Sequence, residues 1–251
     1  MRAGSLGPVP EGVETYAELA GRILRRPARL GRTRLVAVDG PSGAGKTSFA
    51  ARLAAALRVA TGTAPDDADL TAGSAGTIGR GPAGPADPAG PAGRAGRDEA
   101  DPVPVVHTDD LLDGWADQFT FWPRLEEWVL APLRAGRPGR YRRYDWHAGR
   151  FADPWIVVPP APVVILEGVS SARAVVAAEL TLAVYVTAPV RLRRDRALAR
   201  DGADLLPQLR RWWQGERRHF AADRTVARAD VVVDGAAAPS HDPAGRFRRL
   251  R

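Results

Sequence analysis

The chain has 251 residues, enough for one α/β domain with a substantial core and too few for two large domains. It contains no cysteine, which excludes disulfides, a thiolate nucleophile and a cysteine-ligated zinc site. The formal net charge is +7, but nearly every cation is an arginine interleaved with acids, and this pattern does not indicate a dedicated nucleic-acid groove.

Segments that would place the chain in a membrane are not apparent in the sequence. The first residues lack the apolar stretch of a signal peptide. No apolar run reaches the roughly 18 residues that a membrane-spanning helix needs. We therefore expect a protein without a membrane anchor, located by default in the cytoplasm.

The first part of the chain predicts a helical extension followed by a strand, a turn and a helix. Within residues 1–32, Gly12 to Arg26 carry apolar side chains at helical spacing. Leu35 to Val38 form a short apolar strand, and a glycine-rich turn leads into an Ala/Leu-rich helix from Ser48 to Ala60. We place the main domain at residues 33–235.

Residues 61–104 differ sharply in composition from the rest of that domain. This stretch consists mainly of Gly, Ala, Pro and Asp and has almost no large apolar side chains. Such a segment cannot offset the entropy of ordering by burial. We therefore predict a disordered, low-complexity insertion.

After the insertion, apolar strands alternate with helices. Near-continuous apolar strands in such an alternation predict a parallel sheet covered on both faces. The fold class is thus α/β, a single domain with a doubly wound sheet, and its function should lie at the carboxyl ends of the strands. The predicted strands are 105–107, 163–166, 182–186 and 231–233, the helices are 124–133, 190–200 and 205–220, an Arg- and aromatic-rich loop covers 137–155, and residues 236–251 form a basic tail.

The glycine-rich turn reads Gly-Pro-Ser-Gly-Ala-Gly-Lys-Thr, which is a complete P-loop between a strand and a helix. Its glycines allow backbone N–H groups to point inward as an anion nest, to which the helix adds its positive end. Lys46, the only lysine of the chain, should contact β- and γ-phosphates, and Thr47 should ligate Mg²⁺. The flanking strand and helix disfavour the alternative of a turn without ligand. The predicted nucleotide-binding residues are Gly40, Ser42, Gly43, Ala44, Gly45, Lys46, Thr47 and Ser48.

Acidic residues follow two of the predicted strands. Asp109 and Asp110 come after the second strand, where a carboxylate opposite the γ-phosphate could act as a general base. Alternatively one of them, more readily Asp110, caps the next helix. Glu167 follows an apolar strand and can meet Mg²⁺ or its water, or be a solvated strand end. We expect His107 to be a satisfied buried histidine.

Tryptophans and the remaining histidines carry less specific signals. Trp128, Trp212 and Trp213 stand at helical spacing, which favours packing in the core or over the site above stacking on a base. His219 and His241 lack the spacing of a metal site.

Several of these segments together resemble the uridine kinase family of P-loop nucleoside kinases. The similarity begins with Val36-Ala-Val-Asp-Gly-Pro-Ser-Gly-Ala-Gly-Lys-Thr47 and continues with His107-Thr-Asp-Asp-Leu-Leu112. Tyr144-Asp-Trp146 is similar to the family's nucleoside-pocket segment, and Val163 to Gly168 to its Glu-Gly strand end. An Arg-rich lid and a closing helix with a final strand follow in the family's order. Apart from the insertion, the resemblance covers most of residues 35–235.

The resemblance implies roles for single residues. Asp109 matches the catalytic base, which also lies next to the metal, and Thr47 and Glu167 match the neighbours of Mg²⁺. Tyr144 matches an aromatic residue that holds the nucleoside base. The lid contains Arg194, Arg196 and Arg200, whose guanidinium groups would close over the phosphates.

Two departures from the family pattern concern the nucleoside pocket. Leu112 stands where the family has tyrosine, and Gly149 stands where it has a histidine. His147, two positions earlier, is the substitute we expect to contact substrate. Since neither change touches the phosphate chemistry, the reaction type is better defined than the acceptor.

We therefore expect a kinase that uses ATP and Mg²⁺ to phosphorylate a hydroxyl of a small molecule, most simply the 5′-hydroxyl of uridine or cytidine. Another small acceptor, such as a nucleotide or a sugar-like alcohol, is the nearest alternative. A regulatory or nucleic-acid-associated ATP-binding protein is an alternative of a different class. The sequence leaves the choice between ATP and GTP and the formation of a homo-oligomer open.

Overall fold

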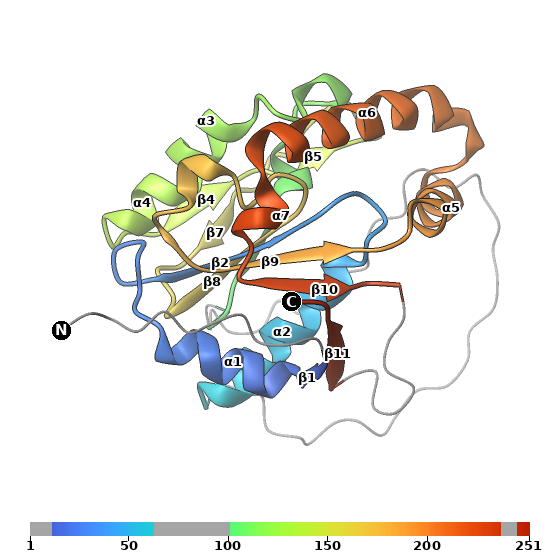
Figure 1. Ribbon diagram of the computed structural model, residues 1–251. Helices are drawn as coiled ribbons and strands as arrows, with labels where there is room; N and C mark the ends of the chain where they lie inside the picture. The colour runs from blue at the N-terminus through green and yellow to red at the C-terminus, as the bar shows by residue number, and fades with distance from the viewer. Residues whose placement is uncertain (1–11, 63–100, 237–244) are drawn as a thin grey trace, which may run out of the picture.

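A seven-stranded sheet forms the centre of the molecule (Figure 1). The computed structural model describes residues 12–62, 101–236 and 245–251. The strands lie in the order β1-β11-β10-β9-β2-β8-β3, and those from β10 to β3 run parallel to one another. In chain order they are β1 (Gly12–Thr15), β2 (Arg34–Asp39), β3 (Val105–His107), β8 (Val163–Glu167), β9 (Leu180–Thr187), β10 (Val231–Asp234) and β11 (Arg246–Arg249).

Helices cover both faces of the sheet. In Figure 1, α1 and α2 lie on one side of it, and α3, α4 and α6 lie on the other. This arrangement confirms the predicted α/β fold with a doubly wound, mainly parallel sheet. No helix in the described part of the chain has the length and apolar character needed to cross a membrane. The helices are α1 (Tyr16–Arg25), α2 (Lys46–Ala60), α3 (Trp122–Leu125), α4 (Ala131–Arg134), α5 (Val190–Asp201), α6 (Leu206–Asp223) and α7 (Thr225–Arg228).

Each face of the sheet has its own hydrophobic core, and β2 contributes to both. Leu35 and Ala37 pack on the side of α3 and α4, whereas Val36 and Val38 pack on the side of α1 and α2. Side chains alternate in this way because successive residues of a strand point to opposite faces. Each fully buried aliphatic side chain contributes roughly 1.5–3 kcal/mol relative to exposure. The four positions of β2 from Leu35 to Val38 are therefore all apolar.

The position of β2 determines where a ligand can bind. β2 lies between β8 and β9, so the chain passes to one side of it with β3 and β8 and to the other side with β9 and β10. In open α/β sheets, ligands bind at such a switch point, beyond the carboxyl ends of the strands. The P-loop leaves β2 at this edge.

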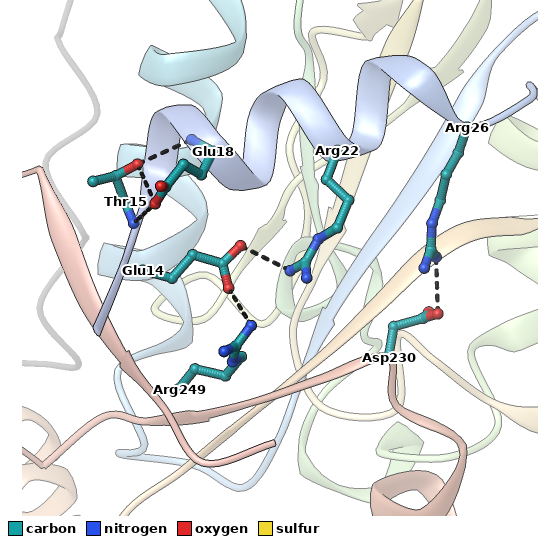
Figure 2. A network of polar contacts seen from close by, with 7 residues as sticks. All are labelled: Glu14, Thr15, Glu18, Arg22, Arg26, Asp230 and Arg249. Carbon is teal, nitrogen blue, oxygen red and sulfur yellow. Dashed lines mark hydrogen bonds and ion pairs between the residues drawn. The ribbon is translucent and has the colours of Figure 1, made fainter. Parts of the chain in front are cut away.

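The N-terminal segment differs from the single helix that the sequence predicted. Gly12–Thr15 form β1, and α1 begins at Tyr16. Thr15 ends the strand because it caps the helix: its Oγ1 accepts from Glu18 N at 3.0 Å, and Glu18 Oε2 accepts from Thr15 N at 2.8 Å (Figure 2). This reciprocal pair satisfies amides that the first turn would otherwise leave without an acceptor.

The C-terminal residues that the sequence suggested to be a basic tail include β11. This strand pairs antiparallel with both β1 and β10, and Phe247 packs against Tyr16 and Phe49 with ring centroids about 5 Å apart. Its Arg249 and Arg22 of α1 converge on the buried Glu14 at 3.1 and 3.0 Å (Figure 2). The two ends of the described chain are therefore part of one sheet.

Most of the predicted insertion, residues 63–100, lies outside the described residues. The segment that follows it already belongs to the fold. Asp101 forms a bidentate ion pair with Arg58 of α2 at 3.0 and 2.7 Å, and Val103 is fully buried. Residues 101–104 therefore lead into β3 as ordered structure.

The helix predicted at 124–133 is present and slightly longer. It runs through α3, a π-helical turn at Glu126–Leu130 and α4. The turn widens because Pro132 has no N–H to donate to a carbonyl one turn earlier. The loop predicted at 137–155 contains the antiparallel pair β5 (Tyr144–Asp145) and β6 (Arg150–Phe151). It also contains β4 (Gly139–Tyr141), which pairs with β7 (Ile156–Val158) just beyond the predicted loop.

Phe247 provides a test of the role of β11. We predict that Phe247→Ala lowers the free energy of unfolding by about 3–5 kcal/mol, because it removes a buried ring that contacts two others. Arg248→Ala, an exposed position on the same strand, should change it by less than about 0.5 kcal/mol. Urea unfolding followed by far-UV circular dichroism measures both. Equal stabilities would show that β11 does not contribute to the core.

Candidate active site

The P-loop leaves several backbone amides without an acceptor. It spans Gly40 to Thr47, between the end of β2 and the start of α2. The N–H groups of Gly43, Gly45, Lys46 and Thr47 make no hydrogen bond within the described residues. Gly43 and Gly45 have φ angles of 74° and 96°, which only glycine adopts readily. Such unpaired amides at a helix N-terminus form a site for an anion.

The other predicted nucleotide-binding residues occupy distinct positions. Ala44 is fully buried, and Ser48 lines a cavity beside α2. Ser42 turns away from the nest, and its N–H donates to Glu216 of α6 at 2.8 Å. The added Cβ of any residue other than glycine at position 43 would meet the backbone of Arg193. Helix α5 therefore lies directly against the loop.

Lys46 and Thr47 point their polar groups toward the carboxyl edge of the sheet. Lys46 is buried, and its Nζ donates to the Pro41 carbonyl at 3.2 Å, across the loop. Thr47 Oγ1 donates to Glu167 Oε1 at 3.3 Å. The predicted phosphate-binding lysine and the predicted metal neighbours therefore lie together.

Glu167 has a partner that the sequence did not reveal. His107 and Glu167 lie opposite each other in the register of β3 and β8, and His107 Nδ1 is 2.6 Å from Glu167 Oε2. Burial alone would lower the pKa of His107, but the hydrogen bond and charge of Glu167 outweigh it and raise that pKa. His107 is half-buried rather than buried, but it is satisfied as expected, and its partner is the carboxylate at the strand end. Glu167 is held by hydrogen bonds on both of its oxygens.

Asp39, the last residue of β2, is a further residue that sequence reasoning did not single out. It is fully buried, and its carboxylate accepts from the N–H groups of Gly40, Ser170 and Ala172 at 2.7, 2.9 and 2.9 Å. Burial raises its pKa to about 6, although these hydrogen bonds oppose the shift. Asp39 thus ties the start of the P-loop to the loop after β8. The sequence signal was an acid directly after a buried strand.

The two adjacent aspartates after β3 have different surroundings. Asp110 accepts from Tyr141 Oη at 3.4 Å and pairs with Arg143 Nε at 3.2 Å. Asp109 accepts no hydrogen bond from the described residues, and solvent reaches it. Many protein atoms nevertheless surround it, and this desolvation, together with the charge of Glu167, raises its pKa. Asp110 is held by side chains, whereas Asp109 remains available.

Lys46 and Arg200 both act on Asp109 as nearby positive charges. Arg200 lies at the end of α5 and forms a bidentate ion pair with Asp201 at 2.6 and 2.8 Å. The structure therefore brings five of the predicted residues into one charged cluster on the edge of the sheet. These residues are Lys46, Thr47, Asp109, Glu167 and Arg200.

The other two lid arginines lie differently. Arg196 donates to the carbonyls of Gly43 and Gly235 at 3.2 and 2.9 Å, so it holds the P-loop from outside. The Arg194 guanidinium lies over the ring of Trp213, 5.1 Å from its centroid, and lines a separate cavity between α5 and α6. Within the described residues Arg194 makes no hydrogen bond or ion pair with the P-loop.

The predicted substrate residues lie on the small β5–β6 pair, beside the turn that carries Asp109. The ring of Tyr144 is almost buried, edge-on to Trp146 and Phe151 at 5.1 and 5.3 Å. His147 is exposed in the turn, where its backbone N–H donates to Asp145. Tyr144 therefore presents little of its ring face to a ligand.

A cavity of about 390 Å³ opens beside the end of the P-loop. It lies between α2, α5, β10 and β11, with an aromatic wall from Tyr16, Phe49 and Phe247. Its polar lining includes Arg52, Arg196, Asp234 and Arg246. It reaches the P-loop at Gly45 and the start of α2 at Ser48, next to the amide nest.

The oxygen atoms near Thr47 fit a hard cation such as Mg²⁺. The described residues contain no group of three or more His, Asp or Glu side chains arranged around a ready-made metal site. The Thr47 hydroxyl and the Glu167 carboxylate supply two oxygens 3.3 Å apart. Mg²⁺ is commonly held by one or two such groups together with substrate phosphates and waters.

Comparisons with known proteins bear on the fold. No protein-family model matches the chain, and a search of curated proteins found no match. A solved structure of a possible uridine kinase from Bacillus stearothermophilus has a TM-score of 0.54 and 17% identity, covering 86% of this chain and 96% of that one. A putative fructose transport system kinase from Silicibacter sp. TM1040 has a TM-score of 0.47 and 19% identity, covering 86% and 90%. At 17% identity, the first likeness shows a shared P-loop NTPase fold.

The raised pKa of Asp109 can be measured directly. We predict that Glu167→Gln lowers the pKa of Asp109, because it removes a neighbouring negative charge that disfavours the ionised carboxylate. Carbon-13 NMR titration of the carboxyl groups, with Asp109→Asn to assign the signal, measures the change. Asp110 should shift less, since Arg143 and His107 dominate the charges around it. If the pKa of Asp109 stayed unchanged, the charge of Glu167 would not be one of the causes that raise it.

Proposed function

We propose that the protein is an ATP-dependent kinase that transfers the γ-phosphate to a hydroxyl of a small molecule. The observation that carries this proposal is the position of Asp109, an accessible carboxylate under the charges of the P-loop Lys46 and of Arg200. A protein that only binds ATP has no need of a free carboxylate at that point. A kinase needs one to receive the proton of the acceptor hydroxyl.

The unpaired amides of Gly43, Gly45, Lys46 and Thr47 bind the phosphates of the donor. Lys46 exchanges its hydrogen bond to Pro41 for phosphate oxygens, which keeps its charge satisfied. When bound by Thr47 and Glu167, Mg²⁺ supplies positive charge that neutralises the phosphates. The adenosine half extends into the cavity beside Ser48.

Asp109 orients the acceptor hydroxyl and takes its proton as the oxygen bonds to phosphorus and the bond to the leaving ADP breaks. Because burial and Glu167 raise its pKa, Asp109 loses its function as a base at a higher pH than an ordinary aspartate would. Arg200, which already acts on Asp109, balances the charge on the transferring group. Arg196 holds the loop and the strand end together.

For the acceptor we propose the 5′-hydroxyl of uridine or cytidine. The support is the position of β5 beside the turn of Asp109, together with the segment resemblance at Tyr144. Because the ring of Tyr144 is almost buried, another group of the β5–β6 hairpin would contact the nucleobase. His147 is exposed there and can do so. A panel of nucleosides, nucleotides and sugars in a coupled ADP-release assay tests the acceptor. Turnover with a sugar alone would mean that the acceptor is a sugar and not a nucleoside. The proposal that the protein is a kinase would still hold.

Lys46 tests the donor site. We predict that Lys46→Ala, and also the bulkier Lys46→Arg, lowers kcat/KM for ATP by about 10²–10³-fold or more, because Lys46 is the only lysine of the chain. The far-UV spectrum and melting temperature should remain close to those of the wild type. A Lys46→Ala variant with most of the wild-type kcat would contradict the role of the P-loop.

The two aspartates after β3 provide a matched pair. We predict that Asp109→Asn lowers kcat by about 10²–10⁴-fold with little change in ATP affinity, since an amide cannot accept the proton. Asp110→Asn should lower kcat much less, because Asp110 is held by Arg143 and Tyr141. One kinase assay and one ATP titration on each variant are sufficient. The reverse ranking would assign the base to Asp110.

A further inference from the structure

The P-loop contacts a buried carboxylate of α6. Glu216 is 2% exposed, and its Oε1 accepts from Ser42 N at 2.8 Å and from Trp212 Nε1 at 3.0 Å. The Ser42 hydroxyl also donates to this oxygen, and it accepts from Trp212 Nε1 at 2.9 Å. Ser42, Trp212 and Glu216 therefore form a closed hydrogen-bonded group at the third residue of the loop.

A carboxylate in this position has an energetic cost. Within the described residues Glu216 has no lysine, arginine or histidine as an ion-pair partner, so neutral donors alone compensate its charge. The phosphate nest also lies on the same loop, so the charge of Glu216 repels a bound polyphosphate. A residue that carries both costs requires a compensating benefit. The benefit that the contacts indicate is control of the loop backbone.

Helices α5 and α6 hold the P-loop from outside at two successive residues. Glu216 of α6 accepts a hydrogen bond from the N–H of Ser42, and Arg196 of α5 donates one to the carbonyl of Gly43. These contacts turn the polar groups of the outer part of the loop away from the nest. The inward amides of Gly43, Gly45, Lys46 and Thr47 are those that find no acceptor among the described residues. Hydrogen bonds from N–H groups to a charged oxygen are stronger than those to a neutral one, which makes Glu216 an effective anchor.

We propose that Glu216 is a positioning residue that holds the P-loop in its phosphate-binding shape through Ser42. This inference rests on the proposed function of the P-loop as the donor site. Glu216 touches neither substrate nor the reacting atoms. It acts through Ser42, and Trp212 fixes the orientation of both.

The inference predicts a graded set of effects on nucleotide binding. Glu216→Ala removes the acceptor, so the Ser42 backbone should become free and the affinity for a non-hydrolysable ATP analogue with Mg²⁺ should fall about 10-fold or more. Glu216→Gln keeps an acceptor oxygen and removes the repelling charge. It should therefore retain binding within about 3-fold of the wild type.

The test is a double-mutant cycle on full-length protein, read by isothermal titration calorimetry with the ATP analogue. Ser42→Ala keeps the N–H and loses the hydroxyl, so it should weaken binding less than Glu216→Ala. The double variant should bind no more weakly than Glu216→Ala alone, since both changes break one hydrogen-bonded group. Arg218→Ala, an exposed change on the same helix, should bind as the wild type does.

A spectroscopic measurement shows whether the contact is present in solution. Trp212→Phe assigns the Trp212 indole N–H signal in a nitrogen-15 NMR spectrum. That signal should shift and exchange faster with solvent in Glu216→Ala, and it should stay near its wild-type position in Glu216→Gln. These readouts would not follow from a loss of stability alone.

The outcomes separate the inference from the proposed function. If Lys46→Ala loses analogue binding and folded Glu216→Ala binds as the wild type does, the positioning role is wrong. A Glu216→Gln variant as weak as Glu216→Ala would also contradict it, because the acceptor oxygen is retained there. If the wild type itself binds no analogue, the donor-site function fails, and the positioning role fails with it.

Discussion

Four backbone N–H groups of the P-loop have no acceptor within the described residues. Contacts around the loop hold its backbone in the shape that leaves these groups available for a ligand. Unpaired donors are costly in a protein interior unless water or a ligand meets them. The loop therefore needs support from outside the nest. Asp39 binds its first amide, Glu216 binds the amide of Ser42, and Arg196 binds the carbonyl of Gly43. Asp39 ends β2, and α5 and α6 bring Arg196 and Glu216 to the same loop. The loop leaves the sheet at β2, where the strand order reverses.

The same edge concentrates charge in an asymmetric way. Glu167 is hydrogen-bonded on both oxygens by Thr47 and His107. Asp109 has no such partner among the described residues, and burial and Glu167 raise its pKa. Two carboxylates in one site thus have different properties because their neighbours differ. One is suited to hold a cation and the other to accept a proton. The adjacent Asp110 has a third environment, a guanidinium and a phenol, and serves the structure.

The sequence predicted the parts of the molecule that local pattern determines. Apolar runs located the parallel strands, and the eight-residue glycine motif located the P-loop, because both depend on short contiguous segments. It missed β11, since only Phe247 is apolar among arginines there and the strand exists through its pairing with β1. It also missed Glu216, because a single acid on a helix shows its role only when folding brings it, across 174 positions, to Ser42. The residues of 63–100 lie outside the described structure, so the predicted insertion stays a prediction.

The central claim is that this edge of the sheet transfers a phosphoryl group to a nucleoside. Phosphorus-31 NMR of the wild-type protein with ATP, Mg²⁺ and uridine or cytidine tests it most directly, because donor and product are observed in one spectrum. The account predicts that the γ-phosphate signal disappears as a phosphomonoester signal and the signals of ADP grow, and that neither change occurs without the nucleoside. Release of inorganic phosphate at the same rate with and without nucleoside, or ATP signals that stay unchanged throughout, would contradict it.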